Sequence, residues 1–137
     1  MLISTAGPTH LHADADPWAV RASAVRGEAH VRREVVCQDC FAADVSGRRY
    51  VAVAADGAGS APRSEQGSLL AAQTIVSALL APAIRLTRAR IVDAMAAARA
   101  ALADEASRNN ARIDDYATTV VGVAMQGSNG IFFHLGD

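Results

Sequence analysis

The sequence contains no lysine, so all of its positive side chains are arginines, 13 in number. The bias of a GC-rich genome explains an alanine-rich chain without lysine, and we draw no mechanism from it. The absence does exclude a P-loop, which needs a lysine for its phosphates. Fourteen acidic residues bring the formal net charge to -1. No basic face is therefore encoded, and we expect no nucleic-acid partner.

The chain also lacks a long apolar run. No stretch reaches the ~18 apolar residues of a membrane helix, and residues 1–17 have neither the basic start nor the apolar centre of a signal peptide. We therefore expect no membrane association and a cytoplasmic location. At 137 residues, of which 51% are hydrophobic, the chain has the size and composition of one folded domain.

Cysteine is scarce as well, with only Cys37 and Cys40 in a CxxC spacing. If this stretch is extended, residues three apart lie roughly 10 Å apart and point to opposite faces, beyond the ~7 Å limit for a disulfide. A zinc site would need a second pair of ligands. We expect two reduced thiols in or beside a strand.

The first half of the chain predicts strands. Residues 1–16 have no apolar period and predict a loose or edge-paired tail, which leaves residues 17–137 as the domain. Partial alternation predicts a strand over residues 18–27, and the charged residues 28–36 predict a loop. Two apolar runs, 37–45 and 48–55, meet across Ser46 and Gly47, which is a hairpin signal.

The second half predicts two helices followed by two strands. Ser60 is a candidate N-cap for a buried helix whose apolar part runs from Leu69 to Ala81, and a second helix is expected from Thr87 to Ser107. Residues 116–125 and 131–135 read as strands. Because strands and helices do not alternate, we expect an α+β fold with helices packed on antiparallel sheets.

The glycine loop DGAGSAP, residues 56–62, comes between a strand and a helix, as a dinucleotide-binding loop does. The fingerprint fails in detail, because Pro62 stands where a third glycine would be needed. Asp56 also precedes the first glycine, where its carboxylate would repel a pyrophosphate. The loop does not predict a nucleotide site.

A metal site explains the same loop better. Asp56 closes a strand, and Gly57 lets the backbone turn sharply and bring a carbonyl close to the same point. Asp39 lies at the start of the neighbouring strand, and Asp137 ends the last one. Oxygen ligands of this kind suit Mg²⁺ or Mn²⁺. The alternative is that these acids are turn residues.

Four short motifs occur in a fixed order, and together they resemble the metal-dependent type 2C serine/threonine protein phosphatases, especially their bacterial branch. The motifs are QD at 38–39, DGAGSA at 56–61, ATT at 117–119 and LGD at 135–137. The resemblance runs from about Trp18 to the end of the chain. It implies a β-sandwich flanked by helices, with two metal ions at one edge.

The resemblance also implies roles for individual residues. Asp56 would bridge both metals and the Gly57 carbonyl would bind one of them. Asp39 would hold water on the metal by hydrogen bonds, so that Asp56 and Asp39 carry the catalysis. Asp137 matches an acid associated with a third, weaker metal. Two cations would lower the pKa of a shared water and offset charge on the phosphoryl oxygens.

Supporting residues follow from the same motifs. Gln38 stands where many family members have glutamate, which removes one charge from the site. Arg32 or Arg33 would bind the phosphate, although their offset from the first motif does not decide between them. His30 is a further candidate beside the site. Thr118 and Thr119 are expected to support the metal loop by hydrogen bonds.

The implied function is hydrolysis of phosphoserine and phosphothreonine in proteins, with Mn²⁺ or Mg²⁺ as cofactor and the substrate of a serine/threonine kinase as partner. The family has further metal-binding aspartates after its GD motif. We therefore expect an incomplete sandwich, the N-terminal portion of the domain, that is inactive by itself. The alternative is a degenerate, noncatalytic module that binds a partner protein.

Overall fold

The computed structural model describes residues 9–15, 18–81 and 85–136. They form a two-stranded antiparallel hairpin, a four-stranded antiparallel sheet with the order β3-β4-β5-β6, and helices. The elements in chain order are β1 (Thr9–Ala15), β2 (Trp18–Ala24), α1 (Glu28–Arg32), β3 (Asp39–Ser46), β4 (Arg49–Asp56), α2 (Ser64–Leu80), α3 (Arg88–Arg108), the 3₁₀ turn η1 (Ile113–Tyr116), β5 (Val120–Gln126) and β6 (Asn129–Leu135).

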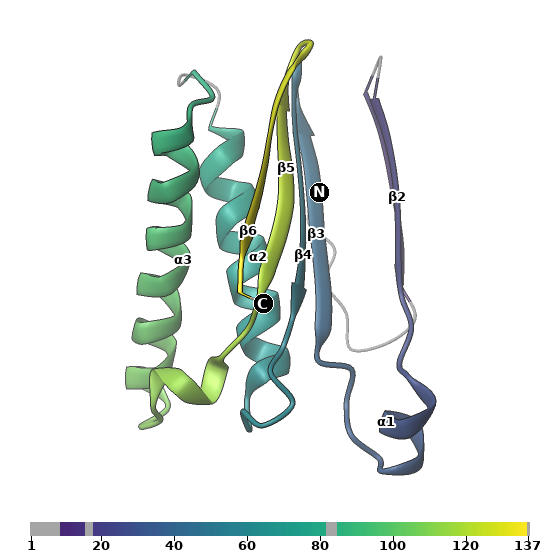
Figure 1. The fold of residues 1–137 in the computed structure, drawn as a ribbon, viewed down its shortest axis with the longest axis vertical. Helices are drawn as coiled ribbons and strands as arrows, with labels where there is room; N and C mark the ends of the chain where they lie inside the picture. The colour runs from purple at the N-terminus through teal and green to yellow at the C-terminus, as the bar shows by residue number, and fades with distance from the viewer. Residues whose placement is uncertain (1–8, 16–17, 82–84, 137) are drawn as a thin grey trace.

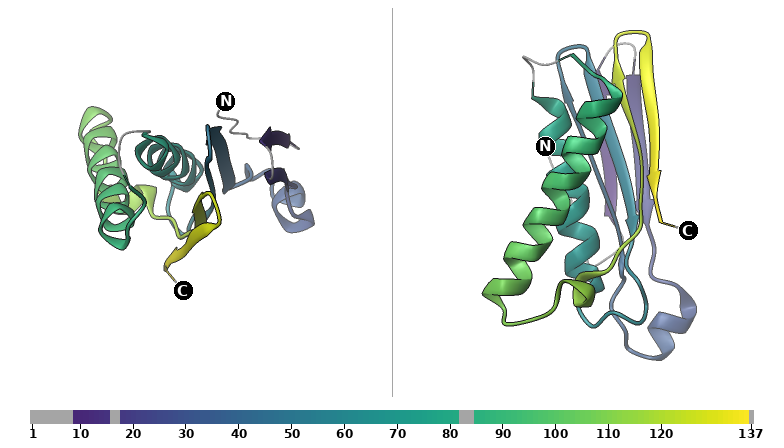
Figure 2. Two further views of the ribbon diagram at one scale, coloured as in Figure 1. Left: turned by 90° about the horizontal axis from the view of Figure 1, so that it is seen from above. Right: turned by 60° about the vertical axis from the view of Figure 1, so that its left-hand side comes forward.

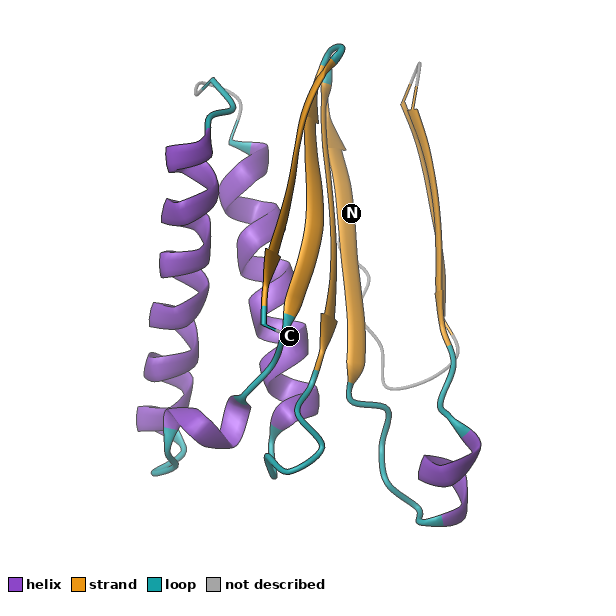
Figure 3. Ribbon diagram, viewed as in Figure 1, coloured by secondary structure: helices purple, strands orange, loops and turns teal. Residues whose placement is uncertain are grey.

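The elements are arranged in layers, as Figures 1 and 3 show: α3 lies outside α2, α2 covers one face of the four-stranded sheet, and the hairpin β1–β2 lies on the other face. The view from above in Figure 2 shows α2 between α3 and the sheet. On the hairpin side, Phe41 and Ala43 of β3 pack against Ala22 and Ala24 of β2. The predicted α+β class with antiparallel sheets is confirmed, and the hairpin is the described part of the second layer.

Small side chains let α2 approach the sheet closely. Ala71, Ala72, Ile75 and Val76 are all buried in one cluster with residues of the sheet and of α3. Because alanine keeps only a methyl group beyond the backbone, the helix can lie deep in the molecule without voids. This agrees with the prediction of a buried helix.

The predicted hairpin between β3 and β4 is confirmed. The strands pair in register from Asp39↔Asp56 to Ser46↔Arg49, and Gly47 in the turn has a φ of +58°. The two-residue loop is Gly47 and Arg48, one position later than the predicted Ser46 and Gly47, because Ser46 still pairs with Arg49 in the ladder. A positive φ is inexpensive for glycine and costly for other residues, so Gly47 favours the turn.

The N-terminal expectations hold in part. Thr9–Ala15, predicted as a loose or edge-paired tail, form a regular strand paired with β2, which agrees with the edge-paired alternative; residues 1–8 lie outside the described part. Residues 28–36 are not all loop, because Glu28–Arg32 form a single helical turn. A five-residue helix spans too few positions to show an apolar period, which is why the pattern missed it.

Two boundaries in the second half also differ. The helix α2 starts at Ser64, and Arg63 rather than Ser60 occupies its N-cap position. A helix starting after Ser60 would need Ala61 in the α conformation, which Pro62 disfavours in the residue before it. Tyr116 belongs to η1 rather than to the following strand, which begins at Val120.

A buried arginine closes the far end of α2. Arg49, at the start of β4, donates from Nη1 to the carbonyl oxygens of Leu79 and Ala81 at 3.2 and 2.5 Å. The last carbonyls of a helix lack intrahelical partners, and a cation there also complements the helix dipole. This contact ties the end of the helix to the sheet.

Among the described residues, no helix combines the length and the apolar content that crossing a bilayer requires.

Gly67→Ala should destabilise the fold, although alanine is the better helix former. A methyl group at Gly67 would lie 2.1 Å from the Tyr116 carbonyl oxygen, which is backbone and cannot rotate away. Overpacking of this kind costs about 1–3 kcal/mol, more than the gain of up to ~1 kcal/mol in helix propensity. Urea unfolding would measure the difference, with the exposed neighbour Gln66→Ala as control. If the unfolding free energy of Gly67→Ala equals or exceeds that of wild type, η1 does not pack tightly against α2 at this position.

Candidate metal centre

Two carboxylates face each other at the end of the sheet where β3 begins and β4 ends. Asp39 and Asp56 are directly opposite in the register of the two strands. The Gly57 N–H donates to the Gln38 carbonyl at 3.1 Å, which makes Asp39 and Asp56 a pair without hydrogen bonds between their own backbones. Side chains in such pairs approach more closely than in the hydrogen-bonded type. The fold thus brings together two acids that are 17 positions apart in the chain.

The proximity of these acids is electrostatically unfavourable. Burial raises the pKa of the Asp39 carboxyl above its ordinary value, and the hydrogen bond to Asp56 and the charge of Asp56 raise it further, while the charge of His30 acts in the opposite direction. Like charges directly opposite each other on neighbouring strands are destabilising. A bound divalent cation would remove this repulsion.

Gly57 is held where no other residue fits. A Cβ atom there would lie 2.7 Å from the Ser64 carbonyl oxygen and 2.8 Å from the Gln38 carbonyl oxygen. Its own carbonyl has a defined direction: the Ala58 N–H donates toward β5, to Ala117 O at 2.9 Å. Since C=O and N–H of one trans peptide point opposite ways, the Gly57 carbonyl is directed to the β3 side, where Asp39 lies.

The segment before β5 clamps the backbone of Asp56. The Thr119 N–H donates to the Asp56 carbonyl at 2.8 Å, and the Thr118 hydroxyl donates to the same carbonyl at 2.9 Å or to the Thr119 carbonyl at 3.0 Å. Thr118 therefore contributes through its side chain, whereas Thr119 contributes through a backbone group that any residue except proline supplies. The two threonines predicted to lie near the metal loop do so by different means.

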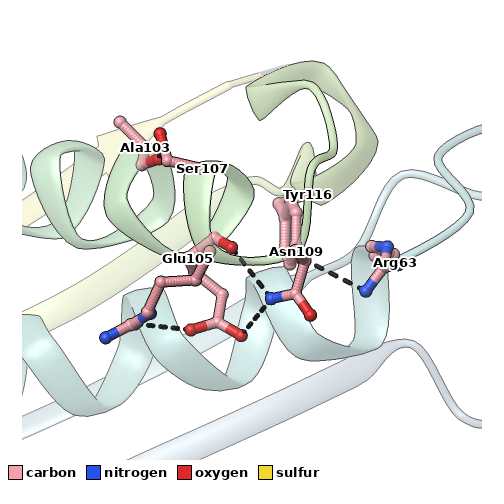
Figure 4. Close-up of polar contacts among 7 residues, drawn as sticks. Arg63, Ala103, Glu105, Ser107, Asn109 and Tyr116 are labelled. Atoms are coloured by element: carbon pink, nitrogen blue, oxygen red, sulfur yellow. Dashed lines mark hydrogen bonds and ion pairs between the residues drawn. The ribbon is translucent and has the colours of Figure 1, made fainter.

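Tyr116, two residues before Thr118, contacts Arg63: the Arg63 Nη1 donates to the Tyr116 hydroxyl at 3.4 Å, as Figure 4 shows. Tyr116 is completely buried, and the Arg63 guanidinium lies 5.8 Å from the centre of its ring. The Arg63 backbone N–H also donates to Asp115 O at 2.9 Å. Near the same place in Figure 4, Glu105 of α3 accepts from Asn109 Nδ2 at 2.7 Å. The loop between Asp56 and α2 is thus fastened to η1.

The predicted arginines precede β3: Arg32 is the last residue of α1 and Arg33 is the next residue. Arg32 forms an exposed ion pair with Glu28 at 2.6 Å, and Arg33 follows α1 directly. His30 is in the same helix and acts electrostatically on Asp39. Asp137, predicted as a further metal ligand, lies outside the described residues.

Sequence patterns missed two buried serines at this site. Ser64 Oγ accepts from Gln38 Nε2 at 2.8 Å, and Ser68 Oγ donates to Gln38 O at 2.6 Å. Both serines belong to the first turns of α2 and have no exposed surface. The sequence did contain a signal for them: two serines stand in the early turns of a helix that is otherwise largely apolar, and buried polar groups need hydrogen-bond partners.

A cavity of about 540 Å³ opens next to the acids, between the hairpin and the sheet. One end is lined by Asp39, Asp56 and Thr119, and the rest is mainly apolar. A cleft with a few convergent polar groups and a perturbed carboxyl has the features of a ligand site.

The donor set fits a hard divalent cation. The described residues include no cluster of three or more histidine, cysteine or acidic side chains. Mg²⁺, however, usually keeps several waters and binds through only one or two carboxylates. The Asp39 and Asp56 carboxylates and the carbonyl of the neighbouring Gly57 are oxygens of this type, and the repulsion between the two carboxylates favours binding of a cation.

Comparison with known protein families identifies the family of the chain. Residues 26–137, most of the chain, match the family model of protein phosphatase 2C. The chain therefore belongs to the protein phosphatase 2C family, which makes it a phosphatase-like hydrolase by descent and confirms the resemblance of the four motifs. The family is generally metal-dependent. Neither the curated proteins nor the solved structures gave a match.

Asp39→Asn should make the metal-free protein more stable at neutral pH. The Asp39 carboxyl binds its proton more tightly in the native state than in the unfolded state. Protonation of Asp39 therefore stabilises the fold fully below pH 3.8, and this contribution is lost as the pH rises through the raised pKa. Asp39→Asn does not undergo this loss. Its free energy of unfolding at neutral pH should therefore exceed that of wild type by about 0.2–1 kcal/mol, the energy typical of one cross-strand pair. Urea unfolding between pH 3 and 7 in EDTA measures it, with the exposed Asp104→Asn as control. If the unfolding free energy of Asp39→Asn falls between pH 3 and 7 by as much as that of wild type, Asp39 and Asp56 do not repel each other in the native state.

Proposed function

We propose that the protein hydrolyses phosphoserine and phosphothreonine in phosphorylated proteins with Mn²⁺ or Mg²⁺ as cofactor, and that residues 17–137 form the N-terminal portion of its catalytic domain. The observation that carries the proposal is the opposed pair Asp39 and Asp56 beside the Gly57 turn. Membership of the protein phosphatase 2C family supports the reaction class. The partner would be a substrate of a serine/threonine kinase.

The residues at the strand ends would contact the cations in two ways. The Asp56 carboxylate and the Gly57 carbonyl would bind them directly, and Asp39 would accept hydrogen bonds from water at the site. When bound, the divalent ions lower the pKa of a shared water and offset the charge of the phosphoryl oxygens. The clamp from Thr118 and Thr119 keeps Asp56 in one position before any ligand arrives.

An arginine of the α1 segment would orient the phosphate. Arg32 already pairs with Glu28, whereas Arg33 lies one residue further toward β3, so we favour Arg33 as the phosphate ligand. Arginine presents a planar fork of N–H groups that matches two phosphate oxygens at once.

The reaction needs no covalent intermediate with the enzyme. A water oxygen forms the new bond to phosphorus while the bond from phosphorus to the serine or threonine oxygen breaks. The leaving oxygen takes up a proton, so the products are inorganic phosphate and the free hydroxyl. Asp39, which would accept a hydrogen bond from water at the site, would also accept the proton that the attacking water gives up.

A noncatalytic, partner-binding module is the second candidate. Two features favour it: Gln38 brings no charge to the site, and the described residues offer two carboxylates there. Such a module would bind its partner equally well with and without divalent ions. Mn²⁺-dependent turnover of a phosphopeptide by the full-length protein separates the two functions.

Asp56→Ala should abolish Mn²⁺ binding and turnover while the fold remains. The loss should exceed the roughly 10–100-fold that removal of an outer-shell partner costs, because Asp56 is the proposed direct ligand. Calorimetry with Mn²⁺ and release of phosphate from phosphoserine, phosphothreonine and phosphotyrosine peptides measure it. Asp93→Asn, an exposed acid of α3, is the control. Unchanged Mn²⁺ affinity in Asp56→Ala would overturn the proposal.

The two threonines should respond differently to valine. Thr118→Val removes the Oγ1 donor to the Asp56 carbonyl and should lower kcat/KM by on the order of 10-fold, with about 0.5–1.5 kcal/mol lost from stability. Thr119→Val keeps the backbone donor and should be close to wild type. Steady-state kinetics and urea unfolding of both variants test this. Equal effects at the two positions would show that the clamp on Asp56 is not what supports the site.

A further inference from the structure

Gln38, the residue before β3, is held by α2 at two points. Its side-chain Nε2 donates to Ser64 Oγ at 2.8 Å, and its backbone carbonyl accepts from Ser68 Oγ at 2.6 Å. Both serines are completely buried. Buried hydroxyls with defined partners restrict the groups that they contact. The two hydrogen bonds therefore fix the orientation of both the backbone and the side chain of Gln38.

The contact with Ser64 determines which end of the amide faces the glycine turn. A carboxamide carries donors on its nitrogen and an acceptor on its oxygen, at opposite sides of one plane. With Nε2 bound to Ser64, Oε1 lies toward the turn, 3.8 Å from the position that a Cβ atom of Gly59 would occupy. This turn directly follows Asp56 and includes Gly57.

We propose that Ser64 is a positioning residue that holds the amide of Gln38 so that its oxygen, and not its nitrogen, is presented to the cation site beside Asp56. The inference rests on the proposed function, because it concerns the same metal centre. An amide oxygen is a suitable donor for a hard cation or for its water. It adds no third negative charge to the pair formed by Asp39 and Asp56, which already repel each other.

A double-mutant cycle tests this role, with Mn²⁺ affinity from calorimetry as the readout. Ser64→Ala should weaken Mn²⁺ binding about 10-fold, as loss of an outer-shell partner typically does. In the Gln38→Glu background, the same substitution should have little effect. The two carboxylate oxygens are equivalent, so one faces the turn whichever way the group lies. A merely structural role of Ser64 would cost the same affinity in both backgrounds.

Thr74→Val is the matched control, because it removes a hydroxyl of the same helix that donates to Leu70 O at 2.7 Å, away from the turn. Its Mn²⁺ affinity should equal that of wild type. If Ser64→Ala does not fold, Gln38→Met removes the amide oxygen without shortening the side chain. A 10-fold loss in that variant supports the inference, and wild-type affinity overturns it.

The outcomes separate this inference from the proposed function. Mn²⁺ binding by wild type together with unchanged affinity in Ser64→Ala, or an equal loss in both backgrounds, overturns the role of Ser64 alone. Absence of Mn²⁺ binding by wild-type full-length protein overturns the proposed function and this inference with it. A loss of affinity confined to the background that carries Gln38 supports both.

Discussion

The candidate site depends on the close approach of three backbone segments at Gly57. The end of β4, the residue before β3 and the first turn of α2 meet where a single Cβ atom would come within 2.8 Å of two carbonyl oxygens. Because only glycine fits there, the distance between the two strands and the helix is set by backbone contact rather than by flexible side chains. The positions of Asp56, Gln38 and Ser64 all follow from this contact.

Several polar groups surround Gly57, and packing of the core does not require them. The acid pair faces the cavity, the threonine clamp holds Asp56 from the β5 side, and Ser64 and Ser68 hold Gln38 from the helix side. Opposed carboxylates at the exposed strand ends and buried hydroxyls in α2 both add less to stability than apolar side chains that are well packed. That cost is understandable where oxygen ligands must be held in position for a cation.

The helix α2 links the stability of the fold to this geometry. Its alanine-rich face lets it lie against the sheet, Gly67 allows the backbone of Tyr116 to cross it, and Arg49 secures its far end. A shift of α2 would therefore move Ser64 and η1 together. Substitutions far from the acids can be expected to affect the site through this helix rather than through direct contact.

The sequence by itself determined the two long helices, the strands of the four-stranded sheet, the turn near Gly47 and the motif order that reveals the family, because apolar period, glycine and short motifs are local signals. It also pointed to Asp39, Asp56 and Gly57 as neighbours at strand ends. Only the tertiary structure decided that Thr118 acts through its side chain and Thr119 through its backbone, and that two serines of α2 hold Gln38. These outcomes depend on contacts between segments far apart in the chain, and no local pattern of residues encodes such distances.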